Sequence, residues 1–177
     1  HAYLLVSAGS TYEANVDDKA TAPGWVDWRE AGKGERIGTN PWLNRIDYPS
    51  NYIYTNLTDD LIGDFTFADI PSGLTWSSDP HTVGGTGVQV RLRTWQSPLG
   101  DDELRVHLYN GTHWKPLLVL IPEDLPDPSY LLYGTRTDID VSDFLNTTDK
   151  INNAQMRLEK VTVGEPDTIY VDYACIR

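Results

Sequence analysis

The chain has 177 residues, of which 40% are hydrophobic, a length and composition typical of one globular domain with its own core. Its 26 acidic residues outnumber its 14 lysines and arginines, and the net charge of −12 argues against binding to nucleic acid or to an anionic membrane surface. The single cysteine, Cys175, excludes an internal disulfide, and no apolar run approaches the roughly 18 residues of a membrane span.

The first part of the chain predicts short strands between long loops. Residues 1–8 (HAYLLVSA) form a short apolar run that ends at a Gly-Ser pair. Residues 11–50 are rich in glycine, proline and tryptophan, which favours long ordered loops pinned by aromatic burial. Residues 52–55 predict a strand, and residues 64–68 predict another whose alternation turns Phe65 and Phe67 inward.

The clearest pattern lies in residues 88–120. Apolar and polar residues alternate in 88–93 and again in 104–109, as in half-buried antiparallel strands. Asn110-Gly111 follows, a sequence that favours a two-residue type I′ hairpin turn. That turn would pair Tyr109 with Thr112 and His107 with Trp114.

The last third predicts further short strands. Three prolines in residues 121–129 indicate a connection, and strands are expected at 130–133, 137–141, 153–163 and 168–176. Residues 142–151 predict one helical turn capped by Ser142. Period two places Cys175 on one buried face with Ile169, Val171 and Tyr173. Eight to ten short strands predict a single all-β domain over residues 1–177, an antiparallel β-sandwich, and the long early loops favour a jelly roll.

Five segments together carry a resemblance: DFTFADIPSG, GVQVRLRTW, ELRVHLYNG, DIDVSDFLNTTDKINNAQMRLE and TIYVDYACI. In these segments the chain resembles β-sandwich modules of surface, filament or phage-tail-like structural proteins, over roughly residues 25–177. Those modules are similar in fold to carbohydrate-binding modules. The resemblance implies a non-catalytic module at the cell surface or outside the cell.

Three sequons occur in predicted turns, at Asn56, Asn110 and Asn146, each with threonine at the third position. In a host that performs N-glycosylation these asparagines are candidate acceptors. The alternative is that they are ordinary polar turns.

A candidate ligand face follows from the hairpin. Its polar side would carry Arg105, His107, Tyr109 and Trp114, with residues 91, 93 and 95 beside it if that strand is adjacent. Sugars stack on aromatic rings and accept hydrogen bonds from arginine and histidine, so this face is a tentative carbohydrate-binding site. The alternative is a solvated face, or one covered by a loop or a neighbouring subunit.

The sequence supports a metal site less well than it supports the ligand face. The predicted register puts His107 and His113 on opposite faces, and His81 has no acid or cysteine at ligand spacing, so zinc is not expected. Aspartates in three regions, 59–60, 101–102 and 138–143, form oxygen-rich turns that could hold a structural calcium, but none matches an EF-hand loop, and the alternative is that they are solvated turns. No cofactor is predicted.

No nucleophile elbow, zinc-protease or phosphate-loop motif occurs, so an enzyme is not predicted, although a polysaccharide-degrading jelly roll stays as a third reading. The favoured hypothesis is an extracellular or cell-surface structural subunit that assembles with copies of itself, with residues 1–8 as an exchanged or edge strand. The alternative hypothesis is a carbohydrate-binding module that uses the hairpin face. Neither involves nucleic acid or membrane insertion.

Overall fold

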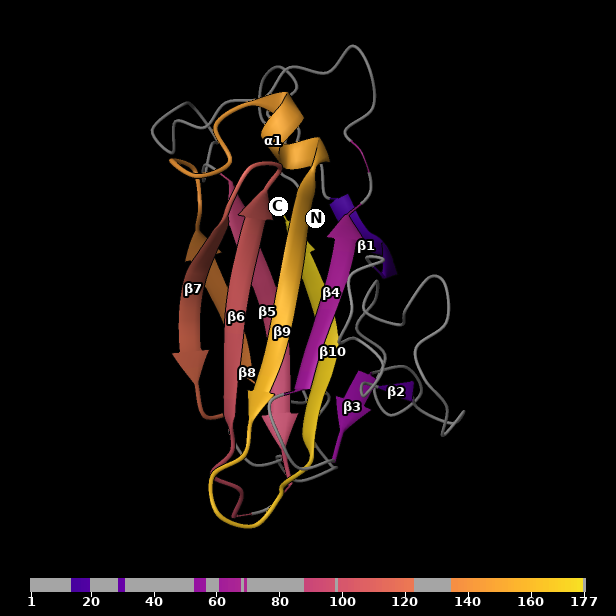
Figure 1. The fold of residues 1–177 in the computed structure, drawn as a ribbon, viewed down its shortest axis with the longest axis vertical. Coiled ribbons are helices and arrows are strands. Elements are labelled where there is room, and N and C mark those ends of the chain that lie inside the picture. The colour runs from indigo at the N-terminus through magenta and orange to yellow at the C-terminus, as the bar shows by residue number, and fades with distance from the viewer. Residues whose placement is uncertain are drawn as a thin grey trace.

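The computed structural model describes residues 14–19, 29–30, 53–56, 61–67, 69, 88–97, 99–122 and 135–176. These residues form ten strands and one short helix (Figure 1). The elements are β1 (Ala14–Lys19), β2 (Arg29–Glu30), β3 (Ile53–Thr55), β4 (Leu61–Phe67), β5 (Gln89–Gln96), β6 (Glu103–Asn110), β7 (Trp114–Leu120), β8 (Thr135–Asp140), α1 (Thr148–Asn152), β9 (Ala154–Val161) and β10 (Ile169–Ile176). The strands predicted at 1–8 and 130–133, and most of the loops predicted in 11–50, lie outside the described residues.

The strands build two antiparallel sheets that pack face to face. The front sheet has the order β1-β4-β9-β6-β7, and the second sheet has the order β2-β3-β10-β5-β8. The chain crosses between the sheets repeatedly, so strands that are neighbours in a sheet are often distant in sequence. In the front sheet β9 lies between β4 and β6, and in the second sheet β5 pairs with β10. This Greek-key arrangement confirms the predicted jelly-roll sandwich.

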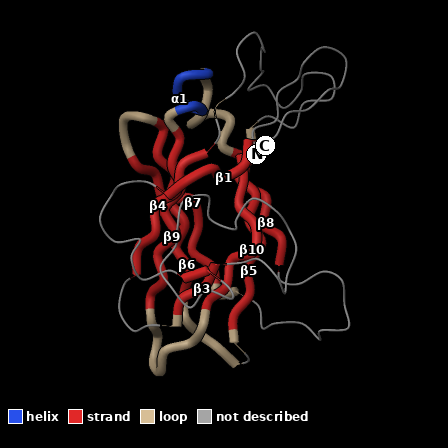
Figure 2. Tube along the Cα trace, turned by 90° about the vertical axis from the view of Figure 1, so that its right-hand side faces the viewer, coloured by secondary structure: helices blue, strands red, loops and turns tan. Residues whose placement is uncertain are grey.

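Strand β1 joins the two sheets along one side. Its first residues pair with β10, and after a register shift between Val16 and Asp18 it continues along β4. Figure 2 shows the two layers edge-on, with β1 between them near one end. At the opposite side, among the described strands, β7 and β8 each pair with a neighbour on one side only.

The core lies between the sheets and follows the predicted alternation. In β6, Leu104, Val106 and Leu108 are fully buried, whereas the residues between them are half-buried. Strand β9 repeats the pattern with Met156 and Leu158. The inward positions predicted for Phe65 and Phe67 are confirmed, since both are buried in the same cluster. Together these apolar side chains supply the hydrophobic driving force for the sandwich.

The hairpin turn differs from the prediction. Tyr109 pairs with Trp114, not with Thr112, and His107 pairs with Pro116. The side chain of Asn110 explains the longer connection, because its Oδ1 accepts hydrogen bonds from the backbone amides of Thr112 and His113, each at 3.1 Å. The Asn110 side chain thus serves as the acceptor for two turn amides. Next to the turn the register moves by two residues, so Trp114 keeps its predicted face.

Strand β5 lies in the second sheet, between β10 and β8, and the expectation that it might flank β6 is wrong. Arg91 there forms a double contact with Asp138, with Nε–Oδ1 at 2.6 Å and Nη2–Oδ2 at 3.1 Å. Trp95 is fully buried and stacks on Tyr170, with ring centroids 5.2 Å apart. These side chains therefore belong to the opposite layer of the molecule.

Two local predictions in the last third also need correction. Helix α1 is capped by Thr147, whose Oγ1 accepts from the Lys150 amide, whereas Ser142 donates to Asp140 and accepts from the Val88 amide. Cys175 is buried as predicted.

Cys175 does not share a face with Ile169 and Val171. A register shift after Val171 leaves it opposite Arg91, while Ala174 and Ile176 join the core. One extra residue in the strand reverses the alternation beyond it.

Candidate functional site

The outward side of the front sheet gathers polar and aromatic side chains from four strands. On β6, Arg105, His107 and Tyr109 face outward, opposite to the buried residues of that strand. The register sets Arg105 between Val119 and Glu159, His107 between Pro116 and Arg157, and Tyr109 between Trp114 and Gln155. We call this surface the outer face; it comprises Asp64, Glu103, Arg105, His107, Tyr109, Trp114, Gln155, Arg157 and Glu159.

An indole held from two sides lies at one edge of the outer face, where strand β7 begins. The Trp114 ring lies 5.2 Å from the Tyr109 ring, tilted by 36°, and the Arg157 guanidinium carbon lies 4.3 Å from the Trp114 ring centroid. The second contact has the geometry of a cation–π interaction. Because Trp114, Tyr109 and Arg157 come from β7, β6 and β9, three strands fix the orientation of the ring.

Arg157 is itself anchored on its other side. Its Nε and Nη2 donate to the two carboxylate oxygens of Asp64 at 2.7 and 2.8 Å, and the Asp64 side chain is only 1% exposed. This hydrogen bonding raises the pKa of Arg157 against the opposing effect of burial. A bidentate pair of this kind fixes both position and plane of the guanidinium. The chain of contacts from Asp64 to Trp114 thus spans β4, β9 and β7.

The remaining charges of the outer face are also paired. His107 Nε2 lies 3.1 Å from Glu159 Oε2, with both side chains partly buried. Arg105 Nη2 lies 3.2 Å from Glu103 Oε2. With the Arg157–Asp64 pair, each arginine described on this face has a carboxylate within hydrogen-bonding distance.

The four residues predicted from the sequence, Arg105, His107, Tyr109 and Trp114, do lie on one face. Strands β9 and β4 contribute four further residues that were not predicted, namely Gln155, Arg157, Glu159 and Asp64. Alternation in residues 154–160 identifies the first three as the polar side of a strand. It does not reveal that this strand lies beside β6.

A second polar cluster lies at the other end of the sandwich, where the β5–β6 and β9–β10 connections meet. Asp102 and Lys160 are both fully buried, with Nζ–Oδ2 at 2.8 Å. The backbone amides of Val163 and Asp167 donate to the two oxygens of Asp102 at 2.7 and 2.8 Å. Burial would raise the pKa of Asp102, but the hydrogen bonds from Lys160 and the two amides bring it below its usual value.

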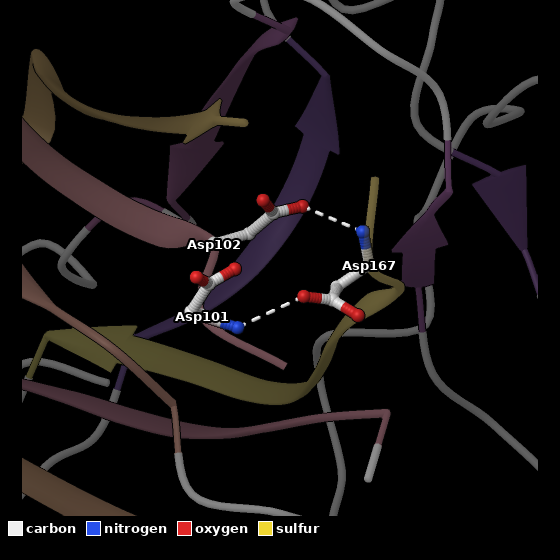
Figure 3. A group of neighbouring side chains, drawn as sticks. All are labelled: Asp101, Asp102 and Asp167. Carbon is white, nitrogen blue, oxygen red and sulfur yellow. Dashed lines mark hydrogen bonds between the residues drawn. The ribbon is translucent and has the colours of Figure 1, made fainter. Parts of the chain in front are cut away.

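The same cluster contains a group of carboxylates that could approach a metal ion. Ligand oxygens of Asp101, Asp102 and Asp167 lie within 4.8 Å of one another (Figure 3). Two of these carboxylates already have partners, since Asp167 accepts from the Asp101 amide at 2.8 Å and Asp102 accepts from Lys160. The buried ammonium supplies positive charge where a cation would, so the arrangement fits a structural clamp between two loops better than a calcium site.

Other predicted metal ligands lie elsewhere. Asp138 pairs with Arg91, and Asp140 accepts from Ser142. The His113 ring packs edge-on against Phe144, whereas His107 pairs with Glu159, so the two histidines have different partners. The aspartates at 59–60 and His81 lie outside the described residues.

The three sequon asparagines differ in their surroundings. Asn56 is exposed, and Asn146 is exposed with its Oδ1 accepting from Lys150 Nζ at 2.7 Å. Asn110 is only 3% exposed and accepts three hydrogen bonds within its turn. A glycan on Asn110 would have to displace this turn, whereas Asn56 and Asn146 have room for one.

No protein-family model and no curated protein matches the sequence. Among solved structures, the chain is similar to the K1 cleaved adhesin domain of Lys-gingipain from Porphyromonas gingivalis, with 16% identity, a TM-score of 0.43 and coverage of 96% of this chain and 98% of that one. It is also similar to a CBM15 xylan-binding module, with 16% identity, a TM-score of 0.38 and coverage of 92% and 95%. Likenesses this distant carry no argument about function. Among the residues described, no helix has the length and apolar character needed to cross a membrane.

Proposed function

We propose that the chain is a non-catalytic binding module that holds a glycan on its outer face. The observation that carries the proposal is the Trp114 ring, which is partly exposed and is fixed by Tyr109 and Arg157. Sugar rings present apolar C–H faces that pack on an indole. A ring already held in place loses little conformational freedom when the ligand binds, which favours affinity.

Hydrogen-bonding groups of the outer face lie on the neighbouring strands β6 and β9. His107, Gln155 and Glu159 are half-buried, so each retains exposed surface on the outer face. They offer donors and acceptors to hydroxyl groups from fixed strand positions. A rigid aromatic centre with polar neighbours is the usual composition of a small-ligand site.

The carboxylates of the outer face support binding rather than hydrolysis. Glycoside hydrolysis generally needs two carboxyl groups flanking the bond, one of which must donate a proton. Here Asp64 is buried against Arg157, Glu159 is paired with His107, and Glu103 is paired with Arg105. Each of the three carboxylates therefore already has a basic partner on this face.

The test is binding of the purified chain to a panel of polysaccharides, by pull-down on insoluble polymers and by affinity electrophoresis in soluble ones. Trp114→Ala should weaken binding by about 2 kcal/mol, roughly thirty-fold, as expected for an aromatic side chain that anchors a ligand. The matched control is Lys115→Ala on the same strand, because Lys115 points away from this face toward Phe144. Undiminished binding by a folded Trp114→Ala variant would refute the proposal.

A second candidate function, self-assembly into a filament or surface array, is favoured by the exposed edge strand β7. Val119 near its end and Ile121 just after it are each 59% exposed, and exposed apolar edges promote pairing between chains. Pro116 and the adjacent register shift blunt the other half of the edge. The strand exchange predicted for residues 1–8 falls outside the described residues.

Light scattering and negative-stain imaging test this second candidate. Polymers that disappear on deletion of residues 1–8, or on Val119→Lys, would support it, and a monomer at all concentrations would contradict it. Either function would place the chain outside the cell or at its surface.

A further inference from the structure

We infer that the outer face selects neutral glycans and excludes acidic ones. The inference rests on the proposed function and adds the chemical class of the ligand. Its basis is the pairing of charges on the face, which adds Glu103, Arg105 and Glu159 to the aromatic contact that carries the proposed function.

The first step concerns the cations that would recognise an acidic sugar. Uronates and sulfated sugars are bound chiefly by arginine, which offers paired N–H donors to an anionic group. Arg157 offers the two nitrogens of one edge, Nε and Nη2, to Asp64. Since Asp64 is 1% exposed and this pair spans two strands, a ligand anion would have to compete with a buried, preformed partner.

The second step concerns the more exposed arginine. Arg105, whose side chain is 40% exposed, lies 3.2 Å from Glu103 two residues earlier on the same strand. Glu103 and Arg105 therefore point to the same side of the sheet, where their charges cancel at short range. An incoming carboxylate would meet both members of the pair.

The third step is the sum of charge over the surface. With His107 left aside, the outer face carries two arginines (Arg105, Arg157) and three carboxylates (Asp64, Glu103, Glu159), a sum of −1. The whole chain carries −12. Like charges brought together at an interface cost several kcal/mol and slow the encounter. A neutral polysaccharide meets neither penalty and uses the same polar groups through its hydroxyls.

The test compares one neutral and one acidic polymer, hydroxyethylcellulose or xylan against polygalacturonate, in affinity electrophoresis at low and at physiological ionic strength. The native chain should bind a neutral polymer and bind polygalacturonate at least about ten-fold more weakly.

The decisive variant is the double substitution Glu103→Gln, Glu159→Gln, which releases Arg105 and His107 from their acidic partners. It should gain binding to polygalacturonate, and added salt should remove the gain.

The matched control is Glu165→Gln, Asp143→Asn. Both residues are exposed and lie in connections outside the outer face, and the pair changes the net charge by the same amount. It should leave polygalacturonate binding unchanged. A gain equal to that of the test variant would mean that overall charge, and not the pairing on the outer face, sets the selectivity, and would overturn the inference.

The remaining outcomes distinguish a failure of glycan binding from a failure of the selectivity for neutral glycans. If the native chain binds no polysaccharide of the panel, the proposed function fails and the inference with it. If it binds polygalacturonate as tightly as the neutral polymer, glycan binding stands and the inference is refuted. The inference is also refuted if the Glu103→Gln, Glu159→Gln variant folds normally and gains nothing.

Discussion

The buried Asp102–Lys160 pair gives the sharpest prediction of stability. Lys160→Met keeps much of the side-chain volume but removes the ammonium that faces Asp102 at 2.8 Å. Both side chains are fully buried, so solvent does not screen the loss. Breaking a buried pair by removing one partner costs about 3–5 kcal/mol, because the other charge is left uncompensated. For a domain of this size that corresponds to a fall in Tm of about 6–20 °C.

The loss should depend on pH, and the pKa of Asp102 gives its sign. That pKa is depressed in the folded state, so its contribution to stability is present above the usual value of 3.8 and is lost as pH falls through the lower folded value. Lys160→Met removes one of the hydrogen bonds that depress it. The difference in unfolding free energy between the native chain and the variant should therefore be largest at neutral pH and should shrink in acid.

The assay is urea unfolding followed by tryptophan fluorescence, repeated from neutral pH into the acid range. Lys150→Met is the matched control, because Lys150 lies on the surface helix and its loss should cost less than about 1 kcal/mol. A loss below about 1 kcal/mol for Lys160→Met, or a loss that stays constant with pH, would refute the assignment of a buried charge pair.

Three further predictions concern the connections. Leu99 has a φ of +62° and is 94% exposed, so Leu99→Gly should raise the unfolding free energy by about 0.5–1 kcal/mol in urea titrations, and a decrease would contradict the strain. Asn110→Ala should lower the unfolding free energy by about 1–3 kcal/mol because it leaves the turn amides without an acceptor; a loss no larger than that of Asn56→Ala would count against this role. In a glycosylating host, peptide mapping by mass spectrometry should find glycans on Asn56 and Asn146 and an unmodified Asn110, and occupancy of Asn110 in folded protein would contradict the turn geometry.

The sequence determined which side is buried in the strands that alternate regularly, such as β6 and β9. Alternation in residues 104–109 and in 64–68 identified core residues correctly, because successive side chains of a strand point to opposite faces whatever the neighbouring strands are. The same rule placed Arg105, His107, Tyr109 and Trp114 on one face even though the turn was predicted two residues too short. The number and spacing of the strands determined the fold class.

Strand neighbours were decided only by the tertiary structure. Trp114 is held by Arg157, and Arg157 by Asp64, a residue 93 positions away in the chain. Strand β5, which precedes β6 in sequence, lies in the other layer. Which strands pair depends on how the two sheets pack over a common core. The spacing of residues along the chain does not predict this pairing.

Local irregularities were equally beyond the sequence. The reversal of face at Cys175 follows from one extra residue in β10, and the longer hairpin follows from the side chain of Asn110 taking over the turn amides. Each changes the local free energy by only a few kcal/mol, so packing against neighbouring segments decides between the regular and the irregular form. The apolar pattern thus determined which face of a regular strand is buried. The assembled sandwich determined which side chains meet on each face.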